Sequence, residues 1–299
     1  VSFKQAKQQL KERLASLNHS LNQRLWKATA DIPFEQWLAS HQPFHWLAEF
    51  YQIIHDNGGF DVIIGNPPYV EYNKKDRTTG QSVSDIYKLS NYQTISCGNL
   101  YAYIMERTTN IVNGASKFSM IIPMSVITTE RMLPLRTLLF KLYAYIYLYN
   151  LAGDWHPGKL FEGVRSLFSI ITMSNKEAIQ HIIHTTKYTR WATIQGPFLF
   201  TNKLQYTANK ENIISESYPK IGDENISCIL KKVSSNQPIL CNMIAGNYKV
   251  YYRNAGIAYY NISLNFIPFF EINGIQSTSS TLKSIAINSK SMVDTIVSY

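Results

Sequence analysis

The stretch Phe60-Asp61-Val62-Ile63-Ile64-Gly65-Asn66-Pro67-Pro68-Tyr69 is the most informative part of the chain. Residues 61–64 form a short apolar run rich in β-branched side chains, which is typical of a buried strand in a parallel sheet. Gly65 ends the run, and Asn66 follows directly. In an open α/β sheet, ligands bind just beyond the carboxyl ends of the strands. The tetrapeptide at 66–69 therefore lies where the chemistry of such a protein is expected.

The tetrapeptide has the composition of a rigid acceptor site. Pro67 and Pro68 lack N–H groups and have fixed φ angles, so the loop offers carbonyl oxygens without competing donors. The Asn66 side-chain oxygen and the Pro67 carbonyl can together accept both hydrogens of an amino group conjugated to a ring, which would free the nitrogen lone pair for attack. Tyr69 offers a flat face for stacking of a planar substrate. The alternative, a plain Pro-Pro turn, gives no reason for Asn and Tyr at these positions.

This motif resembles that of the amino-group DNA methyltransferases that use S-adenosylmethionine, and its Asn form is similar to the adenine-N6 branch. Further segments resemble the type IIG restriction–modification and phage-defence methyltransferases: Pro43-Phe44-His45-Trp46, Glu49-Phe50 and Gly58-Gly59-Phe60-Asp61. The resemblance implies an α/β fold that is part of a Rossmann-like methyltransferase sheet. It implies a cytoplasmic, site-specific enzyme that methylates adenine N6 of a flipped base in double-stranded DNA. The catalytic residues it implies are Asn66, Pro67, Pro68 and Tyr69.

The segment after the motif predicts a helix and a second strand. The helix is expected to open at Asn99-Leu100 and to end near Val112, with Asn113-Gly114 as its C-cap. Residues 118–123 read as a buried strand, which completes a βαβ unit. In the resembling family the first turn of this helix lines the cofactor pocket, and the matching position is Ile104. The resemblance thus implies cofactor contacts from Asn66, Pro68 and Ile104, with core packing as the alternative for Ile104.

Further along, residues 129–141 predict a helix, and residues 143–151 and 166–173 predict strands. In the resembling family, the loop before the second of these strands carries a side chain that packs against the flipped base. Phe161 matches that position. The resemblance therefore implies that Tyr69 and Phe161 both contact the target base, and a purely structural core role is the alternative for Phe161.

The charge of the chain favours a polyanionic partner. The sequence has 29 Lys and Arg against 20 Asp and Glu, a formal net charge of +9. The candidate DNA-binding residues lie in two segments. One is the polar loop at 71–98, and the other is the stretch 248–260, where basic and aromatic residues alternate around a glycine. A β-hairpin with cross-strand Tyr pairs is the alternative for 248–260. The candidates are Lys74, Lys75, Arg77, Lys249 and Arg253.

The pattern of predicted secondary structure changes near residue 180. Residues 1–180 are expected to be the C-terminal portion of a methyltransferase catalytic domain, and residues 1–30 an amphipathic helix within it. The remaining residues, 181–299, contain many short strand-like segments and few long helices. This part resembles the start of a β-rich target-recognition domain.

Several expected features are missing. No glycine-rich loop follows a strand, so we expect another polypeptide segment, upstream on the same or another chain, to carry the cofactor motif. The cysteines show no metal spacing and suggest a reducing compartment, and no stretch reads as a membrane span. Two alternatives remain open: a non-catalytic DNA-binding fragment or subunit, or a methyltransferase acting on protein glutamine or on RNA. The recognition sequence cannot be deduced.

Overall fold

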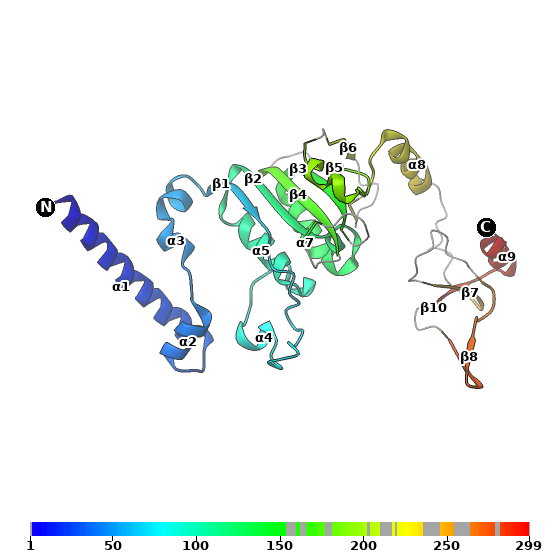
Figure 1. Cartoon of the computed structure of the whole chain (residues 1–299), viewed down its shortest axis with the longest axis horizontal. Helices are drawn as coiled ribbons and strands as arrows, with labels where there is room; N and C mark the ends of the chain where they lie inside the picture. The colour runs from blue at the N-terminus through cyan, green and yellow to red at the C-terminus, as the bar shows by residue number, and fades with distance from the viewer. Residues whose placement is uncertain are drawn as a thin grey trace. The chain divides into compact units, whose positions relative to one another are not determined.

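The computed structural model spans residues 1–299 and forms two compact units, Val1–Lys231 and Lys232–Tyr299 (Figure 1). The residues that the structure describes are 2–153, 160–161, 166–176, 181–201, 204–209, 217–218, 220–235, 246–253, 264–278 and 282–298. Across this part of the chain, none of the helices combines the length and the apolar character that a membrane span requires.

The chain forms α-helices, short 3-10 or π-helical turns (η) and β-strands. The helices are α1 (Phe3–Thr29), α2 (Phe34–His41), α3 (Trp46–Glu49), α4 (Val83–Ile86), α5 (Leu100–Thr109), α6 (Ser125–Thr128), α7 (Leu133–Leu142), α8 (Glu224–Ser235) and α9 (Lys290–Ser298). The turns are η1 (Gln52–Asp56), η2 (Ile95–Cys97), η3 (Glu130–Met132) and η4 (Thr193–Phe198). The strands are β1 (Phe60–Gly65), β2 (Val112–Pro123), β3 (Tyr143–Gly153), β4 (Ser166–Lys176), β5 (Ile182–Thr185), β6 (Thr207–Asn209), β7 (Tyr248–Arg253), β8 (Phe270–Ile272), β9 (Ile275–Ser277) and β10 (Leu282–Ile287).

The first unit is built on a mixed six-stranded sheet in the order β1-β2-β4-β3-β5-β6. Strands β1, β2, β3 and β5 run in one direction, and β4 and β6 run in the other. Strand β1, helix α5 and strand β2 form the predicted βαβ unit, because β1 and β2 are parallel neighbours and α5 connects them. The unit is therefore a mixed α/β structure, as the sequence predicts.

Alternating residues of the central strands divide the core between the two faces of this sheet. Phe118, Met120 and Ile122 of β2 contribute to the larger cluster, together with side chains of α5 and α7. Phe168 of β4 and Tyr149 of β3 belong to a smaller cluster. The two clusters use opposite residue parities on β4, so they cover opposite faces. The sheet is thus packed on both sides over its central strands.

Three expectations about local structure are wrong. Helix α5 ends at Thr109 and is followed by Asn110, and Asn113-Gly114 belongs to β2 instead of capping the helix. Parallel pairing causes this, since Val112 already lies opposite Phe60. Strand β1 is also less buried than predicted, because among the described residues it pairs only with β2 and lies at the edge of the sheet.

The two compact units divide at residue 231, and the expected domain boundary near residue 180 falls inside the first unit. Strands β5 and β6 account for the difference, because they extend the same six-stranded sheet beyond β3. In the second unit, β7 pairs with β10 and β8 pairs with β9. The hairpin considered as the alternative for 248–260 would need residues 254–260, which lie outside the described part of the chain.

Helix α1 is the predicted amphipathic helix, but none of its residues is buried. Its contacts are with the segment that follows it. Asn18 donates to a carboxylate oxygen of Glu49 at 2.7 Å, and the Asn22 side-chain oxygen lies 2.7 Å from Nε2 of His45. His45 therefore has the structural contact expected of it.

Candidate active site

Asn66 lies directly beyond the carboxyl end of β1. The last residue of that strand, Gly65, is paired with Met120 of β2. Pro67 is buried, whereas Asn66 and Pro68 are exposed. Among the described residues, no protein donor contacts the Pro67 carbonyl oxygen. The two proposed acceptors are thus carried on a loop that one buried proline anchors to the protein.

The hydroxyl group of Tyr69 holds Asn66 in place. It lies 2.7 Å from Oδ1 of Asn66 and 2.9 Å from the main-chain oxygen of Ile121. A phenol has one hydrogen to donate, so it can serve only one of these two oxygens fully at a time. Tyr69 can therefore release Asn66 to an incoming amino group and still donate to Ile121. The Asn66 oxygen becomes free without leaving the tyrosine hydroxyl unpaired.

The ring of Tyr69 is packed between the two core clusters of the sheet. Its centroid lies 6.3 Å from that of Tyr101 in an edge-on arrangement, and 5.9 Å from that of Phe168. Tyr101 belongs to the cluster around α5, and Phe168 to the smaller cluster on the other face. Burial raises the pKa of Tyr69 to about 12. The hydroxyl is therefore protonated at neutral pH and is available as a donor.

The chain that follows the loop is hydrogen-bonded to the start of α5. The amide of Leu100 donates to the Val70 carbonyl at 2.9 Å, and the Asn99 side chain caps the helix by accepting from the amide of Tyr101. Further along α5, the buried Glu106 accepts from the amides of Gln93 and Thr94. The long polar segment at 71–98 is thus anchored to α5, and it contains the short helices α4 and η2.

Phe161 lies near Tyr69. Its ring makes an edge-on contact with Phe168 at 5.4 Å, and both rings belong to the smaller cluster. Tyr69 contacts the same Phe168. The two side chains expected to contact the target base are therefore joined through one fully buried phenylalanine. Phe168 has no specific sequence signal beyond its place in an apolar strand.

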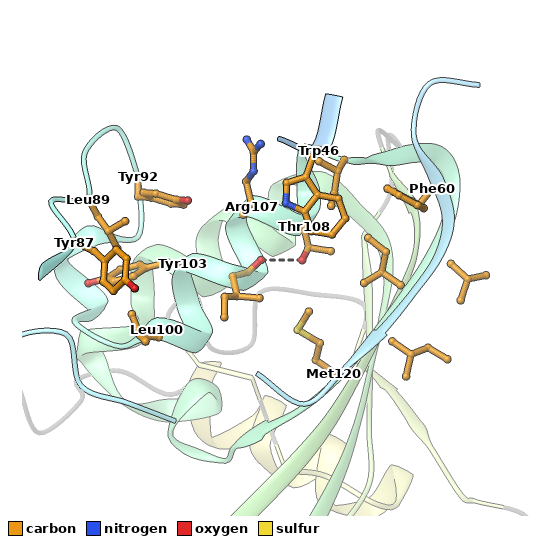
Figure 2. A pocket seen from close by; sticks show the side chains of 15 residues that line it. Trp46, Phe60, Tyr87, Leu89, Tyr92, Leu100, Tyr103, Arg107, Thr108 and Met120 are labelled. Carbon is orange, nitrogen blue, oxygen red and sulfur yellow. Dashed lines mark hydrogen bonds between the residues drawn. The ribbon is translucent and has the colours of Figure 1, made fainter. Parts of the chain in front are cut away.

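Ile104 does not share a described cavity with Asn66 or Pro68. It lines a largely apolar cavity of about 810 Å³ between β1 and α5. Figure 2 shows Tyr87, Leu89, Tyr92, Leu100 and Tyr103 grouped at one end of this cavity, and Trp46 and Phe60 toward the other. Within the part of the chain that the structure describes, Arg107 is the only charged residue that lines it. No carboxylate of the described residues reaches its wall, so this chain supplies mainly apolar contacts there.

The candidate DNA-binding residues fall into both units. Lys74, Lys75 and Arg77 are exposed in the segment after the motif, in the first unit. In the same segment Glu71 forms an ion pair with Arg131 at 2.7 Å, which lowers the pKa of the glutamate through the hydrogen bond from that arginine. The other two candidates, Lys249 and Arg253, lie on β7 in the second unit, and Lys249 is exposed.

The family model for the Eco57I restriction-modification methylase matches residues 2–154, which is just over half of the chain and includes Asn66–Tyr69. The chain belongs to the Eco57I restriction–modification methylase family. This agrees with the resemblance drawn from the Asn-Pro-Pro-Tyr motif. A comparison with curated proteins found no match.

Solved structures of restriction–modification enzymes are similar to parts of this Eco57I-family chain. One is a nuclease-deletion mutant of the Type ISP enzyme LlaGI in complex with a DNA substrate mimic, with 18% identity over 56% of this chain and 16% of that chain, at a TM-score of 0.44. Another is the ATP-dependent Type ISP enzyme LlaBIII bound to DNA. It is 17% identical over 56% of this chain and 13% of that chain, with a TM-score of 0.43. A third is the methyltransferase subunit of a type I restriction-modification system from Streptococcus thermophilus. It is 14% identical over 60% of this chain and 33% of that chain, with a TM-score of 0.29. The chain thus spans less than a fifth of the first two, and the family assignment rests on the sequence match.

Proposed function

We propose that this chain carries the base-accepting part of a site-specific DNA methyltransferase that modifies adenine N6 in a restriction–modification or phage-defence system. The observation that carries the proposal is the Asn66–Tyr69 loop beyond the carboxyl end of β1, in a member of the Eco57I methylase family. The sheet around it is proposed to be the C-terminal part of a Rossmann-like methyltransferase domain. The second unit, with its paired short strands, is proposed to begin a target-recognition region.

The loop suits an exocyclic amino group. The Asn66 oxygen and the Pro67 carbonyl accept its two hydrogens, which favours tetrahedral geometry at nitrogen and directs the lone pair toward the methyl donor. As the amino group arrives, the Tyr69 hydroxyl gives up its hydrogen bond to Asn66 and donates to the Ile121 carbonyl instead. The hydroxyl therefore keeps a hydrogen-bond partner throughout. The ring of Tyr69 and that of Phe161 supply apolar contacts for the flipped base.

The methyl donor is proposed to be S-adenosylmethionine, which supplies an electrophilic methyl group on a sulfonium when bound. Asn66, Pro68 and Ile104 are its proposed contacts in this chain. The residues here fit only one side of such a cofactor, because the cavity at Ile104 has no carboxylate among its lining residues and the sequence has no glycine-rich loop after a strand. A further polypeptide segment is therefore proposed to supply the rest.

Double-stranded DNA is the proposed partner. The net charge of +9 and the exposed Lys74, Lys75 and Arg77 support it, with Lys249 and Arg253 as further candidates. Phosphate contacts release counterions, so the dissociation constant for duplex DNA should rise steeply between about 50 and 200 mM salt. An affinity that stays flat over this range, measured by fluorescence anisotropy, would contradict the proposal.

The test is methyl transfer by the completed enzyme. The chain is joined to the segment of an Eco57I-family methylase that carries the glycine-rich loop, and N6-methyladenine is measured in plasmid DNA by mass spectrometry. Asn66→Ala should lower the rate roughly a hundredfold, since one oriented hydrogen bond in the transition state is worth about 3 kcal/mol. Asn57→Ala, an exposed asparagine outside the loop, is the control.

The outcomes separate the alternatives. If Asn66→Ala methylates adenine normally, the mechanism is wrong. A completed enzyme that binds DNA without methylating it would instead indicate a non-catalytic DNA-binding subunit.

A further inference from the structure

A second cavity, of about 520 Å³, lies at the smaller core cluster of the first unit. Its walls include Tyr149 and Trp191, which are buried members of that cluster. Tyr69 and Phe161 pack against the same cluster. Among the described residues, this cavity shares none of its lining with the cavity between β1 and α5. It is therefore a separate site that neighbours the proposed contacts of the target base.

The cavity lies at the edge of the sheet that carries Asn66. One of its walls follows β5, and the chain there stays beside β3: Thr189 is paired in parallel with Leu151, and its amide donates to the Asn150 carbonyl at 2.9 Å. Strands β1, β3 and β5 run in the same direction, so their carboxyl ends meet at one edge. Three inter-strand steps, about 14 Å at about 4.8 Å each, separate the end of β3 from that of β1. This distance corresponds to only a few nucleotides along a DNA strand.

Two cations, Lys187 and Arg190, line the cavity, and among the described residues its wall contains no carboxylate. Both side chains are exposed, and neither forms an ion pair with a described residue. The guanidinium carbon of Arg190 lies 5.6 Å from the centre of the Tyr188 ring, and this cation–π contact orients it. The charges of the cavity therefore favour an anion, and the planar guanidinium group suits a phosphate.

The main chain at Lys187 is held in place by the segment 221–222. The Thr185 hydroxyl donates to the Ile221 carbonyl at 2.9 Å, and both residues are buried. Gly222 approaches so closely that a Cβ atom added to it would lie 2.5 Å from the amide nitrogen of Lys187. The lysine therefore projects into the cavity wall from a tightly packed backbone.

The aromatic part of the wall suits a planar group. Phe198 of η4 lines the cavity and is 58% exposed, so a large apolar surface is left in contact with water. Cations beside an exposed aromatic ring are what proteins use to hold single-stranded nucleic acid, through phosphate contacts and base stacking. A bare phosphate would leave Phe198 uncovered, and an apolar ligand would leave both cations without a counter-charge. A nucleotide satisfies all three side chains.

We infer that this cavity binds a nucleotide of the DNA strand that carries the target base, with its phosphate on Lys187 and Arg190 and its base stacked on Phe198. The source of the nucleotide rests on the proposed function, because that function brings the strand to the edge of the sheet where the cavity lies. The contacts are to a phosphate and to the face of a base, so the site binds without reading sequence. It holds the strand in place beside the flipped base.

Binding of a short single strand tests the two cations. The probe is a fluorescein-labelled hexanucleotide of thymidine, which contains no adenine and so leaves out the proposed target base. Its dissociation constant for the 299-residue chain is measured by fluorescence anisotropy. Lys187→Gln combined with Arg190→Gln should raise this constant roughly tenfold, because the phosphate contacts are lost.

The matched control is Lys141→Gln combined with Arg24→Gln. Both of these side chains are also exposed, neither lines the cavity, and the change in net charge is the same. The control should bind the hexanucleotide nearly as well as the unaltered chain. Equal losses in the two double variants would overturn the inference, because overall charge would then explain the binding.

The stacking contact is tested at Phe198. Phe198→Ala should raise the dissociation constant of the hexanucleotide roughly tenfold. Phe200→Ala is its control, because Phe200 is 57% exposed on the same segment but does not line the cavity. The same strand carrying 5-iodouracil should form photo-crosslinks to the aromatic side chains of the cavity, which mass spectrometry of the digested protein locates. Equal losses at the two phenylalanines, or crosslinks confined to other segments, would overturn the inference.

A free nucleotide has the same chemistry as a nucleotide of a strand, so ATP is tested as a competitor. ATP should displace the hexanucleotide only at concentrations well above the dissociation constant of the hexanucleotide. Displacement by ATP at or below that constant would overturn the assignment of the cavity to a DNA strand.

The nucleotide site and the proposed function can fail separately. Asn66→Ala should bind the hexanucleotide as the unaltered chain does, because Asn66 does not line this cavity. Binding that depends on Lys187 and Arg190, in a completed enzyme that does not methylate adenine, would reject the proposed function and leave the nucleotide site intact. Methyl transfer by a completed enzyme whose hexanucleotide binding does not depend on these two cations would do the reverse.

Discussion

The loop beyond β1 and the edge along β1 differ in how completely this chain surrounds them. At the loop, Tyr69 is packed between Tyr101 and Phe168 and hydrogen-bonded to Asn66 and Ile121. Along the edge, Ile64 is exposed and the cavity lined by Ile104 is open. Tyr69 in the first region is held by contacts on several sides, whereas Ile64 in the second region is largely exposed. The difference shows that this chain packs Tyr69 firmly in its own core but leaves β1 partly uncovered, which is what the proposed division of the cofactor site between two polypeptide segments requires.

The largest expected effect concerns Phe168, which joins Tyr69 to Phe161. Phe168→Ala should lower the free energy of unfolding by about 3–5 kcal/mol, since it opens a cavity in a fully buried cluster. Urea denaturation measures this, with Phe198→Ala as a control at an exposed phenylalanine. If both variants lost about the same stability, the loop would be no better packed than the surface.

Tyr69 should affect capture of the base more than stability. In the completed enzyme, Tyr69→Ala removes a stacking face worth about 1–3 kcal/mol, so it should raise KM for plasmid DNA and also lower kcat. Tyr69→Phe keeps the ring and loses only the hydroxyl, so its effect should be mild. Equal losses in the two variants would assign the main role to the hydroxyl and not to the ring.

A substitution at Ile104 tests whether the cavity between β1 and α5 is open in solution. Ile104→Ala should cost only about 1 kcal/mol in the chain alone, because its side chain already borders an open cavity. Ile122→Ala, on the same face of the sheet but fully buried, should cost about 2–5 kcal/mol. An equally large loss at Ile104 would mean that the cavity is closed in solution.

The smallest expected effect is a pH dependence at Tyr69. The pKa of this group is raised from 10.0 to about 12 by burial, so the folded state binds the phenolic proton more tightly than the unfolded state does. The resulting stability is fully present below pH 10 and is lost as pH rises from 10 toward 12. Tyr69→Phe should therefore lose stability less steeply over this range. Parallel curves for the two proteins would contradict the burial argument.

Much of the central sheet could be predicted from sequence, because β1, α5 and β2 each carry their own periodicity and boundaries. The exposure of Ile64 could not, since a β-branched run reads the same whether or not a strand lies beside it. The Asn113-Gly114 prediction failed for a similar reason: pairing of Phe60 with Val112 outweighs a local capping signal.

The candidate site shows the same division. Asn66, Pro67, Pro68 and Tyr69 were recognisable as a motif, and Phe161 by its position before a strand. The Ile121 carbonyl was not, because a main-chain acceptor has no sequence signature. Arg107 was also missed, since one arginine on a helix says nothing about the cavity it lines.

Binding of labelled S-adenosylmethionine tests the central claim most directly. The dissociation constant is measured by equilibrium dialysis for the 299-residue chain alone and for the same chain joined to the segment with the glycine-rich loop. The account predicts that the joined protein binds the cofactor at least a hundredfold more tightly than the chain alone. Equally tight binding by the chain alone would contradict it, because one side of the site would then be sufficient.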